Sequence, residues 1–377
     1  MEDRKQVTKV KIELMIYVYI AICVSMIAYN IVYAFILHHR EKSVASNSRK
    51  FEKIILDEIE NLRNGAAVSE KHKKFLCKKL DRTAGITTFD KALESIFERE
   101  PDITQKYLVE TFSVFEYLTH RYIRKDTLKI AYFPHILHKY NILKHFESER
   151  LTGALLDLLR SVNIYCRENT LKALYSMGRP DTVVSALKII DKNLSFHHPK
   201  LICDGLMFYN GDKDILKDKL FESFKDFSTQ MRVNILNYFR FGNIRCDAQM
   251  LFFLKNENEN LEIRFSAIRY FEKFPVEEAR PIIYELAENE AGRTWEYQAI
   301  ATSALKSYPG DVTFRILVKN LSSSSWHVRQ NSAISCEKLG YTYHDLISVF
   351  DGNDRFAREI MRYRLDRRNS EEETVNA

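Results

Sequence analysis

IRFSAIRYFEKFP, residues 263–275, decides the fold, because VRQNSAISCEKLG at residues 328–340 repeats its pattern. Each stretch opens with an aliphatic residue followed by Arg. Small or apolar residues follow three and four positions after that Arg, and another apolar residue stands at seven. These positions share one face of an α-helix. A Pro or Gly at position eleven ends each stretch, so both predict a short amphipathic helix with a defined end.

The position of this Arg recurs every 32 or 33 residues, at Arg167, Lys200, Arg232, Arg264, Glu296 and Arg329. A constant spacing of this length is typical of a helical repeat array. A second amphipathic stretch follows each breaker, and we expect Asp181, Asp212 and Asp311 to cap these second helices. Each unit is therefore predicted to be helix, turn, helix, with one apolar face per helix that the next unit covers.

The aliphatic-Arg pair, the small residues and the breaker together resemble HEAT repeats, in particular their short variety. The resemblance covers residues 162–341. It implies an all-α chain, a HEAT-like alpha-solenoid of helix-turn-helix repeats with an extended concave surface. The period of 32 or 33 residues is shorter than the ~40–47 of longer HEAT repeats.

Composition agrees with a helical protein. The chain has 377 residues, 45% of them hydrophobic and 29% charged, with only 11 Gly and 7 Pro. These numbers favour a folded chain and argue against a β-sandwich, a barrel or a glycine-rich nucleotide site. The net charge of +6 comes from 57 basic and 51 acidic residues, which is too balanced to indicate a nucleic-acid partner.

An uncharged apolar segment runs from Leu14 to Leu37, preceding the repeats. At a rise of about 1.5 Å per residue it spans the ~30 Å hydrocarbon core of a bilayer, so it predicts one transmembrane helix. A cleaved signal peptide, with SVAS at residues 43–46 as its cleavage site, is the alternative. The apolar region of such peptides has only ~7–15 residues.

The orientation of this helix depends on weaker signals. Basic residues flank both ends almost equally, with slightly more on the C-terminal side. The six cysteines are scattered without a CxxC pair and predict no metal site. Five of them, an odd number, lie outside the apolar segment and read as buried free thiols in a reducing compartment. Both observations predict that the bulk of the chain is cytosolic.

Ala21, Ser25 and Ala28 share one stripe of the predicted membrane helix, and Asn30 adds an amide in its apolar layer. Small residues allow close helix contact, and an amide in hydrocarbon favours a polar partner. Two interpretations stay open. The stripe contacts another membrane helix, or the segment is a plain anchor whose Asn30 lies near the headgroups.

The predicted organisation has five parts: a short N-terminal flank (1–13), the transmembrane helix (14–37), a juxtamembrane segment with an irregular helical N-cap (38–160), the HEAT-like array (161–368) and a disordered tail (369–377). The basic run Lys71–Arg82 near the anchor is a candidate contact for anionic lipid heads; a solvated helix face is the alternative. His135, His138 and His145 lack a further ligand at metal-binding spacing.

Enzyme signatures are absent, since the chain contains no GxxxxGK[ST], GxGxxG, GxSxG or HExxH motif. We therefore predict no catalytic, cofactor-binding or metal-binding residues and no cofactor. The favoured function is a non-catalytic, membrane-anchored scaffold that binds a protein partner on a concave surface lined mainly by the second helices. Polar residues on those helices are the candidate contacts: Lys217, Gln249, Glu285 and Arg315.

Two other functions remain in view. The first is an accessory subunit of a membrane enzyme complex, such as one built on a glycosyltransferase. This function predicts that the anchor helix itself packs on the partner. Some HEAT-like proteins resemble bilin lyases or alkylpurine DNA glycosylases, so a HEAT-like lyase is a third reading. The sequence names neither the partner nor the oligomeric state.

Overall fold

The computed structural model describes residues 2–122, 127–145, 148–193, 198–289 and 294–376. Every regular element in these ranges is a helix, which confirms the all-α prediction. The chain forms two compact units, Met1–Ala173 and Leu174–Ala377. Each unit is described by itself.

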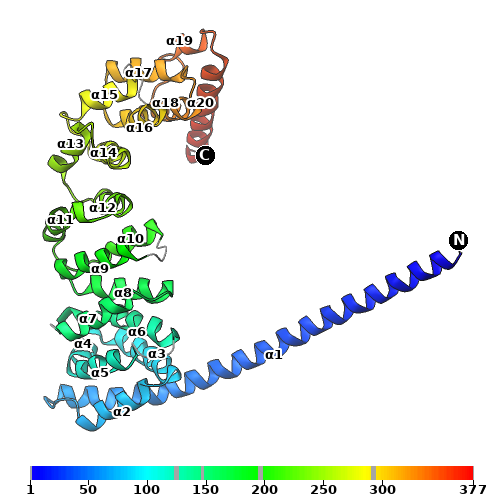
Figure 1. The fold of residues 1–377 in the computed structure, drawn as a ribbon, viewed down its shortest axis with the longest axis vertical. Helices are drawn as coiled ribbons and strands as arrows, with labels where there is room; N and C mark the ends of the chain where they lie inside the picture. Colours follow the sequence, from blue (N-terminus) through cyan, green and yellow to red (C-terminus); the bar gives the residue numbers. More distant parts are fainter. Residues whose placement is uncertain (1, 123–126, 146–147, 194–197, 290–293, 377) are drawn as a thin grey trace. The chain divides into compact units, whose positions relative to one another are not determined.

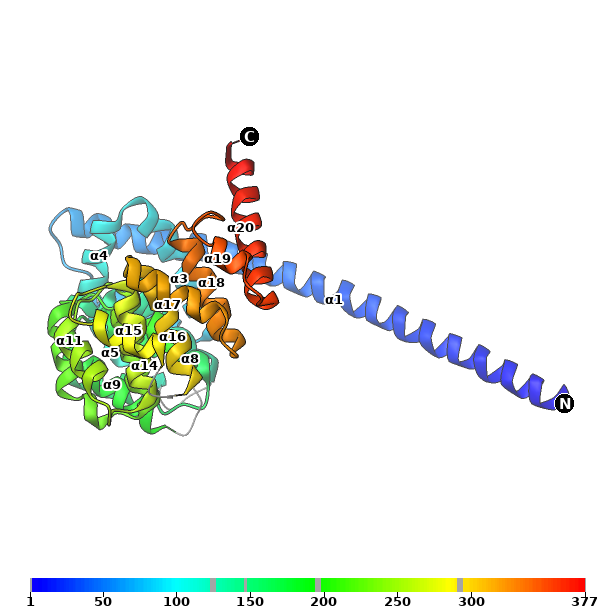
Figure 2. The ribbon, with the colours of Figure 1, turned by 90° about the horizontal axis from the view of Figure 1, so that it is seen from above.

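The first unit begins with α1 (Glu2–Arg63), a single uninterrupted helix of 62 residues (Figures 1 and 2). Residues 38–63 contain neither Gly nor Pro, so nothing in them ends the helix at the boundary predicted after residue 37. At its C-terminal end Phe51, Ile55 and Ile59 are buried, spaced four residues apart on one face. This face packs on α3 (Thr83–Arg99) and α4 (Pro101–Glu110).

The remaining helices of this unit complete its core. They are α2 (Glu70–Leu80), α5 (Phe112–Tyr122), α6 (Thr127–Lys139), the 3-10 turn η1 (Ile142–His145), α7 (Glu149–Leu158) and α8 (Ile164–Ser176), which continues into the second unit. Large side chains such as Phe89, Tyr107 and Phe115 are buried between them.

The second unit contains the predicted helix pairs. The first helices of the pairs are α10 (Pro199–Leu206), α12 (Thr229–Phe241), α14 (Leu261–Lys273), α16 (Trp295–Ala304) and α18 (Trp326–Lys338). The second helices are α9 (Pro180–Lys192), which follows the first helix α8, and then α11 (Lys213–Glu222), α13 (Asp247–Lys255), α15 (Arg280–Glu288) and α17 (Asp311–Leu321). Short turns η2 (Phe224–Asp226) and η3 (Leu305–Ser307) precede α12 and α17, and α19 (Ile347–Phe350) and α20 (Arg355–Asn376) end the chain.

The first helices contact one another in unbroken succession, α10 with α12, α12 with α14, α14 with α16 and α16 with α18. Ala267, Ala301 and Ala333 are fully buried along this row, and small side chains let neighbouring helices approach closely. In Figure 1 this row lies on the inner side of the bend of the second unit. The prediction that second helices line the concave side therefore differs from the structure, because periodicity shows that each helix has a buried face without showing which row curves inward.

Two glycines that were predicted to end helices, Gly178 and Gly211, lie against each other. Gly178, with φ of +70°, ends α8, and a Cβ added to it would come within 3.2 Å of the Gly211 backbone. A Cβ on Gly211 would lie 2.4 Å from the Gly178 carbonyl oxygen. Both positions therefore require glycine.

The capping predictions hold in one case. The Asp212 carboxylate accepts hydrogen bonds from the backbone N–H groups of Asp214 at 2.8 Å and Ile215 at 3.1 Å. Asp181 and Asp311 instead lie within the first turns of α9 and α17, where a carboxylate still interacts favourably with the helix dipole.

The tail predicted to be disordered has a helical backbone, since α20 runs to Asn376. Its consecutive glutamates are good helix formers and no Gly or Pro interrupts them. Ala377 and the side chains from residue 369 onward lie outside the described residues.

Candidate functional site

The four polar residues predicted to contact a partner stand on four separate second helices, α11, α13, α15 and α17. Glu285 and Arg315 are exposed, whereas Lys217 and Gln249 are half-buried. The Lys217 ammonium donates to the Asp214 carboxylate at 2.7 Å on the same helix. The structure therefore distributes these residues along the array and does not gather them into one cluster.

The residues predicted to contact a membrane helix all lie on α1. Ala21, Ser25, Ala28 and Asn30 are exposed, together with the apolar side chains around them. The described residues include this one helix that is long and apolar enough to cross a membrane.

The recurring arginines act within the fold. Arg167 and Arg329 donate to backbone carbonyls six residues earlier, those of Ser161 at 2.8 Å and Ser323 at 2.6 Å. Arg264 is buried and donates to the Leu254 carbonyl at 3.2 Å. Each of these guanidinium groups thus satisfies a carbonyl in the last turn of the preceding helix or just after it, which explains the constant spacing without any ligand.

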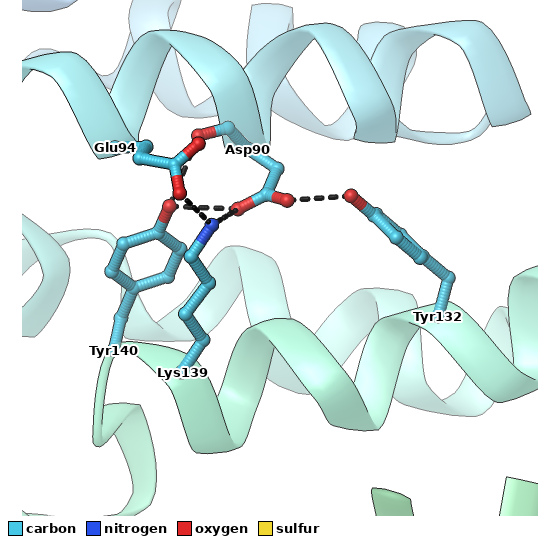
Figure 3. Close-up of polar contacts among 5 residues, drawn as sticks. All are labelled: Asp90, Glu94, Tyr132, Lys139 and Tyr140. Carbon is cyan, nitrogen blue, oxygen red and sulfur yellow. Dashed lines mark hydrogen bonds and ion pairs between the residues drawn. The ribbon is translucent and has the colours of Figure 1, made fainter. Parts of the chain in front are cut away.

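A closed polar network joins α3 to α6 and the residue after it (Figure 3). Asp90 is buried, and its carboxylate accepts hydrogen bonds from the Tyr132 hydroxyl at 2.5 Å, the Tyr140 hydroxyl at 2.7 Å and the Lys139 ammonium at 3.0 Å. The same ammonium donates to Glu94 at 2.8 Å. We call these five residues the Asp90 cluster.

The protonation states within the Asp90 cluster follow from these contacts. Burial pushes the pKa of Asp90 upward, but the hydrogen bonds from Tyr132, Tyr140 and Lys139 outweigh it and hold the pKa below its ordinary value. Burial and the bond to Asp90 raise the pKa of both tyrosines. The Asp90 carboxylate and the Lys139 ammonium therefore both stay ionised at neutral pH, which suits a structural clamp.

Histidines and cysteines offer no metal centre among the described residues, which contain no group of three or more His, Cys, Asp or Glu side chains that could hold an ion. Burial lowers the pKa of His135 and of His138. The side chain of His145 lies outside the described residues. All six cysteines are free, and four of them are buried.

Both tryptophans of the chain are exposed on first helices. Trp295 begins α16 and is 46% exposed, and Trp326 begins α18 and is 56% exposed. The His327 ring stacks on Trp295 with centroids 4.8 Å apart and meets Trp326 edge to face at 5.1 Å. Tryptophan is enriched at the energetic centres of protein interfaces. Helical periodicity missed this aromatic patch, although two Trp at helix starts one repeat apart were a readable signal.

The second unit also holds a cavity of about 650 Å³ between α10, α12 and α14. Its lining includes the cations Lys200, Arg240 and Arg269 and one carboxylate, Asp204. The amide of Asn237 lies among them and accepts from Arg240 at 3.2 Å. This cavity on the inner row also escaped the sequence analysis.

No model of a protein family matches this chain, and no curated protein matches it. Among solved structures, human deoxyhypusine hydroxylase in complex with glycerol is 13% identical, with a TM-score of 0.27 over 79% of this chain and 96% of that chain. A crystal structure of an engineered protein is 14% identical, with a TM-score of 0.32 over 85% of this chain and 93% of that chain. These likenesses concern the helical repeat-like fold alone.

One prediction requires correction. The absence of enzyme motifs led to the expectation that the chain is not an enzyme, but one of the structures it resembles is a hydroxylase. Short linear motifs record local chemistry, whereas a helical repeat array can assemble a site from residues far apart in sequence. The missing motifs therefore do not exclude catalysis.

Proposed function

We propose that this protein is a single-pass membrane protein whose HEAT-like solenoid binds a protein partner, with the bulk of the chain in the cytosol. The observation that carries the proposal is the contrast along α1. Its C-terminal end buries Phe51, Ile55 and Ile59, whereas its apolar residues between Tyr17 and Leu37 are exposed. An uncovered apolar helix of this length is stable in lipid and unfavourable in water.

The inner row of first helices supports the binding role. It presents the aromatic patch of Trp295, His327 and Trp326, and an aromatic group of this kind supplies contact area at low entropic cost. Glu285 and Arg315 on the second helices offer exposed charges, whose usual effect is on association rate. We place the main partner contact on the aromatic patch and a secondary one on Lys217, Gln249, Glu285 and Arg315.

Membrane insertion is tested first. The full chain should resist alkaline carbonate extraction, and a Val24→Lys, Ile27→Lys variant should be released because two charges oppose insertion. A cysteine engineered at position 2 should react with a membrane-impermeant thiol reagent in intact cells, and one engineered at Ser370 should not. The reverse labelling would place the repeats outside the cytosol.

Partner binding is tested by affinity purification from the native membrane. A Trp295→Ser, Trp326→Ser variant should lose a specific partner that wild type retains, while membrane insertion and circular dichroism stay unchanged. The matched comparison reverses or introduces charge at Lys217, Gln249, Glu285 and Arg315 together and should reduce the same partner only modestly. Full retention of the partner by both variants would remove the repeats from the binding surface.

The exposed stripe of Ala21, Ser25, Ala28 and Asn30 favours a second candidate, an accessory subunit whose anchor packs on a helix of a membrane enzyme. Ala21→Leu combined with Asn30→Leu should then dissociate the complex in mild detergent while leaving carbonate resistance intact. If the double variant keeps its partner, the membrane helix does not contribute to partner binding.

A further inference from the structure

The cavity on the inner row lies beside the shortest of three neighbouring first helices. α10 has 8 residues, whereas α12 and α14 have 13 each. The space of about 650 Å³ beside these helices is within the range of small-molecule sites. Lys200 from α10, Arg240 from α12 and Arg269 from α14 line it.

Within the described part of the chain, the two arginines of this lining make no ion pair. Among the described residues, neither Arg240 nor Arg269 has a carboxylate within 4.0 Å. The carboxylate one turn beyond Arg269, that of Glu272, pairs with Lys306 at 2.5 Å instead. In the described ranges, the Arg240 guanidinium donates to the neutral amide of Asn237 at 3.2 Å and lies over the Phe241 ring at 4.4 Å.

The charge and one donor of Arg240 are incompletely satisfied by the residues around it. Burial and the charge of Arg269 lower the pKa of Arg240, and the charge of Glu272 offsets only part of this shift, so the cationic form of Arg240 is disfavoured where it stands. Its Nε is buried and has no hydrogen-bond partner among the residues that the structure describes. A bound anion would accept from the unpaired Nε–H of Arg240 and would compensate the rest of its charge.

We propose that this cavity binds a phosphate monoester, with the Arg240 and Arg269 guanidinium groups as its principal ligands. Three cations against the single carboxylate of Asp204 leave two positive charges, which match a phosphate dianion better than a carboxylate. Guanidinium groups donate two parallel hydrogen bonds to phosphate oxygens. The cavity is larger than phosphate alone, so the group that carries the phosphate lies beside the exposed Phe241 ring. This inference does not rest on the proposed partner binding.

The test is a ³¹P NMR titration of inorganic phosphate and of O-phosphoserine with the full chain in a maltoside detergent at constant ionic strength. Wild type should bind both probes, and O-phosphoserine should bind at least as tightly as phosphate. Arg269→Gln and Arg240→Gln should each weaken binding by about 10-fold, because each removes one charge-assisted pair. Absence of binding to wild type, or equal competition by acetate, would overturn the proposal.

Arg240 is half-buried, so its variant has a structural risk that two other variants avoid. Lys200 is exposed, and Lys200→Gln should weaken binding by about 3-fold without affecting the fold. The matched control is Arg315→Gln, which removes an exposed arginine from α17 and should leave binding unchanged. Equal weakening by the control would show that phosphate only senses the net charge of the chain.

Discussion

The Asp90 cluster of the first unit and the α10–α12–α14 cavity of the second use similar groups with opposite results. The buried Asp90 carboxylate accepts hydrogen bonds from two tyrosines and from Lys139, and the Lys139 ammonium also donates to Glu94 (Figure 3). In the cavity, Arg240 and Arg269 line one space, and neither guanidinium has a carboxylate within 4.0 Å among the described residues.

This contrast separates two uses of charge in a helical protein. A network in which every donor finds an acceptor stabilises the packing of its helices and has little left to offer a ligand. A cavity with unbalanced charge contributes less to stability and retains capacity to bind. The comparison predicts that substitutions at Asp90 act on folding and that substitutions at Arg269 act on binding.

The largest effect is expected two residues before Arg269, where α14 faces the core. Ala267 is fully buried between first helices, so Ala267→Arg forces a charge and a large side chain into a packed seam. We expect a loss of at least about 4 kcal/mol in the free energy of unfolding of the second unit. Both tryptophans lie in this unit, so fluorescence during urea unfolding measures it.

Lys319→Glu is the control for this substitution, because Lys319 is exposed on α17. It should change the same free energy by less than about 0.5 kcal/mol. An Ala267→Arg protein that unfolds at the wild-type urea concentration would disprove the close packing of the first-helix row.

Asp90→Asn should produce the next largest effect. An amide of the same size keeps an acceptor for one tyrosine but leaves Lys139 without its buried counter-charge. We expect a loss of about 2–3 kcal/mol from the first unit. Hydrogen exchange in peptides covering α3 and α6 measures it, and the second unit should keep its wild-type exchange rates. Unchanged exchange in α3 would mean that the cluster contributes no net stability.

At acidic pH, the difference in free energy of unfolding between wild type and Asp90→Asn should disappear. The folded-state pKa of Asp90 lies below its ordinary value of 3.8, so the stability that its charge contributes is fully present above that value. It is lost as the pH falls through the lowered pKa. Far-ultraviolet circular dichroism in urea at pH 7, 5, 4 and 3 should show a constant gap down to pH 5 that narrows below pH 4. A gap that widens on acidification would contradict this sign.

The repeat helices could be predicted because their signals are local. The Arg264 position, the small residue at Ala267 and the breaker at Pro275 lie within three turns, and the same spacing recurs at Arg329. The predicted helices of the array accordingly appear as α12, α14 and α18.

The two charged sites could not be predicted because they depend on contacts between distant residues. Asp90 on α3 and Tyr140, the residue after α6, are 50 residues apart in a region that follows no repeat. The cavity is lined by side chains of three successive first helices, which the period does not bring together by itself, and the marker position at Lys200 fits the period whether α10 has two turns or four. Periodicity also leaves the inward row undetermined, which is why the predicted contacts fell on second helices.

The smallest expected effect on stability is also the most direct test of the comparison. Arg269→Glu places a carboxylate opposite Arg240 and so gives the cavity the counter-charge that Asp90 gives Lys139. Because the site is half-exposed, we expect a gain of only about 0.5–1 kcal/mol in the free energy of unfolding of the second unit. Inorganic phosphate, which should raise the thermal midpoint of the wild type, should no longer do so, since its place is taken by the new carboxylate. Tryptophan fluorescence melts with and without phosphate measure both effects, and Arg315→Glu on α17 should keep the wild-type response. A variant that loses stability yet is still protected by phosphate would show that Arg240 and Arg269 do not share one anion, and the distinction between the closed cluster and the open cavity would fail.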